Sequence, residues 1–431
     1  MNDGIDWDGA AREATELLAE YLRIDTSNPP GNEALAVDFL SRILANDGVP
    51  FEVAESAPGR SNLIARLGPT ERVVTLLNHT DVVPVERQYW HVDPFGGEVR
   101  DGFLYGRGAL DMKSMGIIEL LTLLLLKRQR VPLRRGVAFL AAADEEAGSD
   151  FGVSWLAAHR PDWLTTDLVI NEGAYGLAGQ NGAGVVFELA VSEKVPVWVE
   201  LTVTGRPGHG SVPHADNCAE HLVRALTRVA NWNQELRMTP VMRAHLDAMA
   251  KAGFSAAMDD AAALRAAGRA PGLRERLGSS ISLTTIETGI KVNVIPATAR
   301  ATLDCRLLPD VEPGAFLAEL RDVIDDERVS VSVLNRLYEG GESAFDGEFV
   351  QVVRAVISEL VEGAHLAPEL TTGFTDSRIY RLRGVPAYGF IPCLVDPEDL
   401  AGIHGHDERI SIENLRLGMQ VLYEVVRRLC A

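Results

Sequence analysis

Three short apolar segments of the chain each end in side chains of the kinds that bind metal ions. Residues 72–78 lead into His79-Thr80-Asp81, residues 136–141 into Asp144-Glu145-Glu146, and residues 167–171 into Glu172. Short segments rich in Val, Ile and Leu predict buried parallel strands. Because ligands of open α/β sheets bind at the carboxyl ends of the strands, we expect these side chains to meet at one edge of a sheet.

Taken singly, these residues have ordinary explanations. A lone His after a strand is usually a satisfied polar residue, Asp111 has the position of a helix N-cap, and Glu145-Glu146 resembles a solvated acidic turn. Adjacent carboxylates nevertheless repel each other unless a cation or a shared proton compensates. Their recurrence, together with the His-rich residues 404–408, therefore favours a metal-dependent hydrolase. The candidate ligands offer nitrogen and oxygen but no sulfur, which suits zinc, with manganese or cobalt as substitutes.

Composition narrows the class of protein. A chain of 431 residues predicts two domains, and a net charge of −20 argues against a nucleic-acid partner. The four cysteines are widely separated and form no C-x-x-C pair, as is typical of a reducing compartment. The first residues lack the features of a secretion signal, and the longest apolar stretch, residues 117–126, is too short to span a bilayer. We therefore expect a soluble cytoplasmic protein without a membrane partner.

The first part of the chain alternates between strands and helices. Its expected helices cover residues 8–24, 32–46, 113–128 and 151–159, and its expected strands lie near residues 50–55, 61–67, 72–78, 136–141 and 167–171. A long polar loop separates residues 84 and 108. This alternation predicts an α/β fold with a mostly parallel central sheet and helices on both faces.

The pattern changes after Gly184. Strands are expected at residues 197–204, 280–288, 293–307 and 329–335, with helices at 217–233 and 313–325 and a helical, Ala-rich stretch at 240–277. The β-α-β-β-α-β order predicts an inserted ferredoxin-like α+β domain. Helices at 348–361 and 411–429 and a strand at 386–391 resume the first domain. The predicted division is 1–194 and 339–431 for a catalytic domain, with 195–338 inserted as a lid and dimerisation domain.

Several motifs carry a resemblance to a known family. They are His79–Pro84, Trp90, Asp93–Gly97, Asp101–Lys113, Asp144–Glu146, Asn171–Gly173 and His404-x-x-Asp407-Glu408. Together they resemble the signature of the co-catalytic di-zinc amidohydrolases and peptidases, which include aminoacylase-1, glutamate carboxypeptidase, acetylornithine deacetylase and succinyl-diaminopimelate desuccinylase. The resemblance covers essentially the whole chain. One departure is Ser114-Met115, where the family often has Gly-Gly, and it concerns helix packing more than chemistry.

The resemblance implies a site with two zinc ions. One ion would be held by His79, Asp111 and Glu172, and the other by Asp111, Glu146 and His404, with Asp111 bridging them. Glu145 would be the general base and acid, and Asp81 would orient His79. Only the resemblance distinguishes Glu145 from Glu146 as the base. His406 competes with His404, but the H-x-x-[DN]-E spacing starts at His404.

The inserted domain supplies further candidates through the same resemblance. His209, in a Gly- and Pro-rich loop, resembles a lid-domain His that reaches across a homodimer to polarise the scissile carbonyl in the partner's site. Asn293 and Arg306 match lid motifs and would bind the substrate, Arg306 through a carboxylate. Gly373 begins a segment that resembles the family's substrate loop.

The implied reaction is hydrolysis of an amide or peptide bond beside a free carboxylate, in a small molecule or short peptide, by water that two metal ions activate. A carboxypeptidase or dipeptidase is favoured, and an N-acyl-amino-acid deacylase is the alternative, because the same site serves both. A di-metal aminopeptidase fits less well, since Arg306 would have no carboxylate to bind. A catalytically inactive metal-binding homologue is the non-enzyme alternative, against which the intact Glu145 speaks. Motifs of nucleotide enzymes and serine hydrolases are absent from the sequence.

Overall fold

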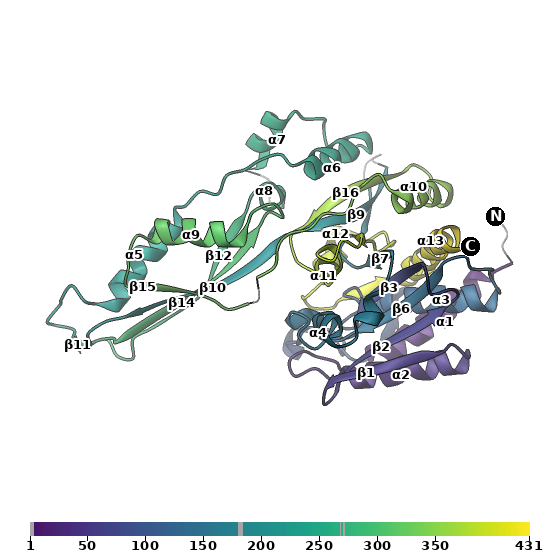
Figure 1. Cartoon of the computed structure of the whole chain (residues 1–431), viewed down its shortest axis with the longest axis horizontal. Coiled ribbons are helices and arrows are strands. Elements are labelled where there is room, and N and C mark those ends of the chain that lie inside the picture. Colours follow the sequence, from purple (N-terminus) through teal and green to yellow (C-terminus); the bar gives the residue numbers. More distant parts are fainter. Residues whose placement is uncertain (1–3, 180–183, 268, 270–271, 336) are drawn as a thin grey trace.

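The computed structural model describes residues 4–179, 184–267, 269, 272–335 and 337–431. The two largest β-sheets occupy separate parts of an elongated molecule (Figure 1). Within the described residues, no helix is both long enough and apolar enough to cross a bilayer.

The larger sheet contains the segments that carry most of the predicted metal ligands. Its order is β1 (Phe51–Ala57), β2 (Arg60–Leu67), β6 (Gly136–Ala142), β3 (Val73–His79), β7 (Leu168–Asn171), β17 (Ala387–Gly389), β9 (Val185–Glu193) and β16 (Ala364–Thr371), with β8 (Gly176–Ala178) paired to β9. Strands β6, β3, β7 and β17 run parallel. Every residue of β3, β6 and β7 is buried, because helices cover both faces of the sheet. The predicted mostly parallel α/β sheet is confirmed.

Helices pack on both faces of this sheet. The main core joins the sheet to α1 (Trp7–Leu22), α2 (Glu33–Asn46), α3 (Lys113–Arg128), α10 (Glu348–Leu360) and α13 (Ile412–Cys430). The opposite face packs against α4 (Val153–His159), the 3₁₀ turn η3 (Pro161–Leu164) and α11 (Ser377–Arg381). Helix α3 is buried from Lys113 through Leu126, so it lies inside the core and fixes the loop that precedes it.

The smaller sheet has the order β12 (Ser280–Thr288), β14 (Thr298–Leu307), β10 (Val195–Thr204) and β15 (Val329–Val333). All its neighbouring strands are antiparallel. Helices α5 (Cys218–Ala230) and α9 (Pro313–Ile324) cover one face, where Val197, Val199, Leu201 and Val203 are fully buried. This arrangement confirms the ferredoxin-like prediction. We call these elements the lid, and β11 (Gly208–His209) with β13 (Val294–Ile295) forms its tip, the end of the lid farthest from the large sheet (Figure 1).

Sequence patterns missed several strands. Strands β9 and β16 pair in parallel at one end of the large sheet, but Glu188 within β9 and Pro368-Glu369 within β16 interrupt their apolar runs. The predicted polar loop at 84–108 contains two short strands, β4 (Glu98–Arg100) and β5 (Phe103–Tyr105), which pair with each other, and β5 pairs with β18 (Arg409–Ser411). That pairing is between residues far apart in the chain, which local patterns cannot reveal.

The Ala-rich stretch forms α6 (Pro240–Lys251), α7 (Asp260–Ala267) and α8 (Leu273–Leu277). Although it lies within the predicted range 195–338, its buried side chains Val241, Met242 and Leu277 join the core of the large sheet. An ion pair of 2.6 Å between Arg276 and the buried Glu369 ties α8 to β16. This helical stretch therefore extends from the lid to β16, at one edge of the large sheet (Figure 1).

Replacing Leu121 of α3 by alanine tests the packing that holds the large sheet together. Leu121 is fully buried, so we expect the free energy of unfolding to fall by about 2–5 kcal/mol through lost transfer free energy and the cavity left behind. Leu35→Ala in α2 is the matched control, because Leu35 is 53% exposed and its loss should change that free energy by less than about 0.5 kcal/mol. Denaturant unfolding followed by tryptophan fluorescence measures both variants, and equal effects would contradict this packing.

Candidate metal centre and active site

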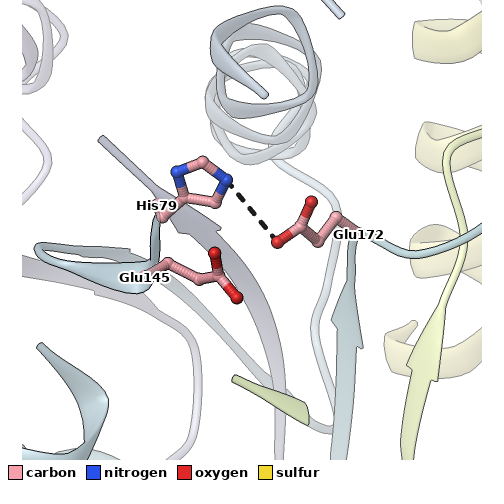
Figure 2. Close-up of side chains that lie close together, drawn as sticks. All are labelled: His79, Glu145 and Glu172. Atoms are coloured by element: carbon pink, nitrogen blue, oxygen red, sulfur yellow. Dashed lines mark ion pairs between the residues drawn. The ribbon is translucent and has the colours of Figure 1, made fainter. Parts of the chain in front are cut away.

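The ends of three neighbouring strands bring together two predicted metal ligands, His79 and Glu172, and the predicted general base, Glu145. His79 is the last residue of β3, Glu145 lies in the 3₁₀ turn η2 (Glu145–Ala147) after β6, and Glu172 follows β7. Their side chains point into one space (Figure 2), where a ligand atom from each lies within 4.8 Å of the others. The Nε2 atom of His79 is 3.5 Å from Oε1 of Glu172. The expected convergence of strand ends is therefore what the structure shows.

Asp111 lies between His79 and His404, the two histidines predicted to bind metal. Its Oδ1 atom is 3.0 Å from Nε2 of His79, and its Oδ2 atom is 3.2 Å from Nε2 of His404. The same nitrogen of His404 is 3.3 Å from Oε2 of Glu146. His406, by contrast, packs against the ring of Tyr89 with centroids 5.2 Å apart. The carboxylate of Asp111 thus has one oxygen on each side, as a bridging ligand requires.

Asp81 fixes both the imidazole of His79 and the turn that carries the two glutamates. The Nδ1 atom of His79 lies 3.0 Å from the backbone oxygen of Asp81 and 3.5 Å from its carboxylate. With only oxygens around Nδ1, this nitrogen donates and Nε2 faces the other ligands. The Asp81 carboxylate also accepts the backbone N–H groups of Glu145 and Glu146, at 3.2 Å each. One buried carboxylate therefore orients residues from two strand ends.

Glu408 organises the loop that presents Asp111. This fully buried carboxylate accepts hydrogen bonds from Nη1 of Arg107 at 2.6 Å and from the backbone N–H groups of Gly108, Leu110 and Asp111 at 3.1, 2.7 and 3.0 Å. Sequence reasoning included Glu408 in a motif but assigned it no role. The sequence feature that could have identified Glu408 is its position four residues after His404. One short segment then supplies both a predicted metal ligand, His404, and a carboxylate that supports the loop of another, Asp111.

Burial and mutual repulsion dominate the electrostatics of the carboxylates. Burial, followed by the charge of Glu172, raises the pKa of Glu145 well above its ordinary value. Burial raises the pKa of Glu172 to about 7 and also raises the pKa of Glu146, to which the charge of Asp111 contributes. Hydrogen bonds to Asp111 and Glu146 raise the pKa of His404 to about 10. Asp111 differs, because its hydrogen bonds to His404 and His79 outweigh burial and lower its pKa. The three glutamates therefore hold protons more readily than ordinary carboxyl groups.

The donor set fits divalent cations. The Oε1 atoms of Glu145 and Glu146 are buried and have no hydrogen-bond partner in the part of the chain that the structure describes. Buried carboxylates rarely persist in this state, because an unpaired charge is costly to bury. The ligand atoms are nitrogen and oxygen in two groups, His79 with Glu145 and Glu172 and His79 with Asp111 and Glu146, which share His79 where the predicted sets share Asp111. Two cations held by these residues would compensate the repulsion, and such a donor set suits zinc, manganese or cobalt.

The candidates in the tip of the lid lie away from this cluster. His209 is an exposed residue of β11, and the backbone oxygen of Asn293 accepts the N–H of Gly210 beside it at 2.9 Å. Figure 1 shows β11 at the end of the lid opposite β3, β6 and β7. A single chain does not bring His209 or Asn293 to the metal ligands.

Arg306 lies at the base of the lid, but its guanidinium is already engaged. Its Nε and Nη2 atoms donate to the carboxylate of Asp304 at 2.7 and 3.0 Å. It also stacks at 5.2 Å on the ring of Phe374, which follows Gly373. The segment that begins at Gly373 therefore contacts the lid through Phe374.

Arg378 is a functional candidate that sequence reasoning overlooked. It is buried, and it stacks on Phe374 at 4.7 Å and on Tyr338 at 5.2 Å. Its Nη1 and Nη2 atoms donate to the backbone oxygens of Thr375 and Gly148 at 2.8 and 3.1 Å. Among the described residues no carboxylate forms an ion pair with it, and its Nε atom has no partner. The segment 373–378 was noted in the sequence, but only this packing singles out its arginine.

Known proteins are similar to this chain in sequence and in architecture. Rat aminoacylase-1A (Rattus norvegicus) is 30% identical over 425 residues, which cover 96% of this chain and 95% of that protein. The fold is shared with an M20 family metallo-carboxypeptidase from Sulfolobus solfataricus (TM-score 0.76, 17% identity, 96% and 98% of the chains). It is shared also with the YXEP protein of Bacillus subtilis, described as a dinuclear metal binding peptidase (TM-score 0.61, 13% identity, 98% and 99%). The model of peptidase family M20/M25/M40 matches residues 75–428, and the chain belongs to this family.

Proposed function

We propose that this protein is a zinc-dependent hydrolase of N-acyl amino acids. Membership of the family makes it a metal-dependent hydrolase of amide or peptide bonds. The observation that carries the proposal is the cluster of His79, Asp111, Glu146, Glu172 and His404 around a space that Glu145 also faces. Similarity to an aminoacylase over nearly the whole chain favours N-acyl amino acids over peptides. A carboxypeptidase or dipeptidase would use the same site, so peptide substrates belong in the same assay.

Glu145 would carry the proton during the reaction. Two divalent ions, when bound, would lower the pKa of a water molecule to roughly 7 and polarise the scissile carbonyl. The carboxylate of Glu145 accepts the proton of the attacking water and then delivers it to the departing amine. Its burial and its unpartnered Oε1 atom support this role, because a raised pKa suits a group that must both take and give a proton.

Two arginines near Phe374 could meet the carboxylate of the substrate. Arg306 would have to release the carboxylate of Asp304 before it could bind the carboxylate of the substrate. Arg378 binds only backbone oxygens in the described part of the chain and is buried. A buried guanidinium with free N–H groups gains most from a new carboxylate partner, so we assign the substrate carboxylate to Arg378, with Arg306 beside it.

A homodimer through the lid would complete the site with His209 and Asn293. Strand β12 pairs on one side only among the described strands, and its Leu283 and Ile286 are exposed. Exposed apolar residues on an open strand edge favour pairing with a second copy. The tip of each lid would then reach the metal ligands of the other chain.

The four free, buried cysteines agree with the reducing compartment that we propose, the cytoplasm.

Hydrolysis of N-acetyl amino acids by the zinc-loaded protein, compared with dipeptides, tests the proposed function directly. Glu145→Gln should lower kcat by about 10²–10⁴-fold, because the general base is lost, while zinc content stays near that of the unchanged protein. Glu362→Gln, at an exposed position, is the control. Turnover by Glu145→Gln close to that of the control would remove Glu145 from the mechanism.

His404→Ala and His406→Ala separate the two neighbouring histidines by metal content. Because only His404 faces Asp111 and Glu146, its loss should reduce bound zinc by about half, whereas His406→Ala should retain the full amount. Elemental analysis after dialysis measures both. The same metal content in the two variants would contradict the assignment of His404.

Mixed dimers test whether His209 acts on the partner's substrate. His209→Ala and Glu145→Gln chains should each be nearly inactive alone. Co-expression should restore up to about a quarter of the activity, since half of the dimers formed at random contain one site with both groups intact. Two copies of the same variant provide the baseline. If mixing restores nothing, His209 acts within its own chain or only structurally.

A further inference from the structure

A pocket of about 170 Å³ lies at the base of the lid, beside the turn that carries Glu145. One wall is Ala147 and Gly148, directly after the two glutamates. The other walls come from the two places where the chain enters and leaves the lid, from the loop before α11 and from the start of α11. The main lining side chains there are Trp198, Leu334, Tyr338, Phe374 and Arg378. The pocket therefore opens next to the proposed reaction centre.

The side chains that line the pocket from the lid are mainly apolar. Trp198 lies on the face of the lid sheet that no helix covers, and its ring meets Phe374 edge-on, with centroids 6.3 Å apart. Leu334 remains 54% exposed at the rim although it is a large apolar residue. A bound apolar group would cover both side chains and remove their surfaces from water.

The size of the pocket limits what it can hold. A cavity of roughly 150 Å³ lined by apolar side chains is enough to bind benzene. The pocket of about 170 Å³ therefore accepts one aromatic ring or a branched aliphatic side chain.

The pocket wall carries charges of both signs. Arg378 places a buried positive charge there, and the carboxylate of Asp150 lines the same pocket at an exposed position. Because these two charges are opposite, the wall does not favour a bound side chain of either sign. A carboxylate on Arg378 would place the α-carbon of the substrate at the pocket mouth, so the side chain on that carbon would point toward Trp198 and Phe374.

We propose that this pocket selects the side chain of the acylated amino acid and favours an aromatic or branched apolar one. This inference rests on the proposed function. It gives Trp198, Phe374 and Leu334 the role of choosing among substrates that the metal centre would treat alike.

The test compares kcat/KM for N-acetyl derivatives of Phe, Leu, Ala, Glu and Lys. The unchanged protein should prefer Phe and Leu to Ala, and Trp198→Ala should reduce the Phe-to-Ala ratio by about 10–100-fold, as removal of an apolar contact surface does. Trp155→Ala is the matched control, because Trp155 stacks on His159 outside the pocket. Leu334→Ala, at an exposed position that folding does not depend on, should lower the same ratio by about threefold or more.

The outcomes separate the two proposals. Hydrolysis without a preference for Phe and Leu, a preference for Glu or Lys, or an unchanged ratio in Trp198→Ala and Leu334→Ala would overturn the pocket assignment and leave the proposed function standing. A further outcome would also overturn the pocket assignment: a higher kcat/KM for N-benzoylglycine than for N-acetylglycine, without a higher kcat/KM for N-acetyl-Phe than for N-acetyl-Ala. The pocket would then bind the acyl group and not the side chain of the amino acid. No hydrolysis of any N-acyl amino acid would overturn both.

Discussion

Several carboxylates meet in a space that excludes most water, and their mutual repulsion is the constraint around which the molecule is built. Asp111, Glu146 and Glu172 lie beside His79 or His404 at distances of 3.0–3.5 Å. Burial penalises each charge and neighbouring carboxylates add to the penalty, whereas His79 and His404 offset part of it. Such a cluster persists only if the surrounding fold holds it in place, and it gains stability when cations bind. The same repulsion that destabilises the folded chain therefore becomes affinity for metal.

The large sheet supplies the rigidity that this cluster needs. Parallel strands β6, β3 and β7 set the spacing of three ligand-bearing turns, and the buried helix α3 fixes the fourth. Two further carboxylates, Asp81 and Glu408, bind backbone N–H groups and so orient the loops that carry predicted metal ligands. The lid contributes differently, because its base lines a pocket beside Glu145 while its tip extends away from the chain's own centre.

Much of this could be predicted from the sequence. Strands β3 and β6 and helix α3 are continuous apolar runs, so their ends and the residues that follow were predictable. Strands β9 and β16 were missed because Glu188, Pro368 and Glu369 interrupt the pattern, and only tertiary contacts such as the pair between Arg276 and Glu369 satisfy those groups. The packing of α6–α8 on the large sheet could not be predicted from the sequence either. Arg306 matched a motif, but no local pattern could show that Asp304 already occupies it or that Arg378 has no such partner.

The bond between Arg107 and Glu408 joins residues 301 positions apart. During synthesis, the loop that presents Asp111 would leave the ribosome long before the carboxylate that shapes it. Until then its backbone N–H groups would face solvent, and His404 would also be missing. The order of translation would thus delay assembly of the site until nearly the whole polypeptide has emerged.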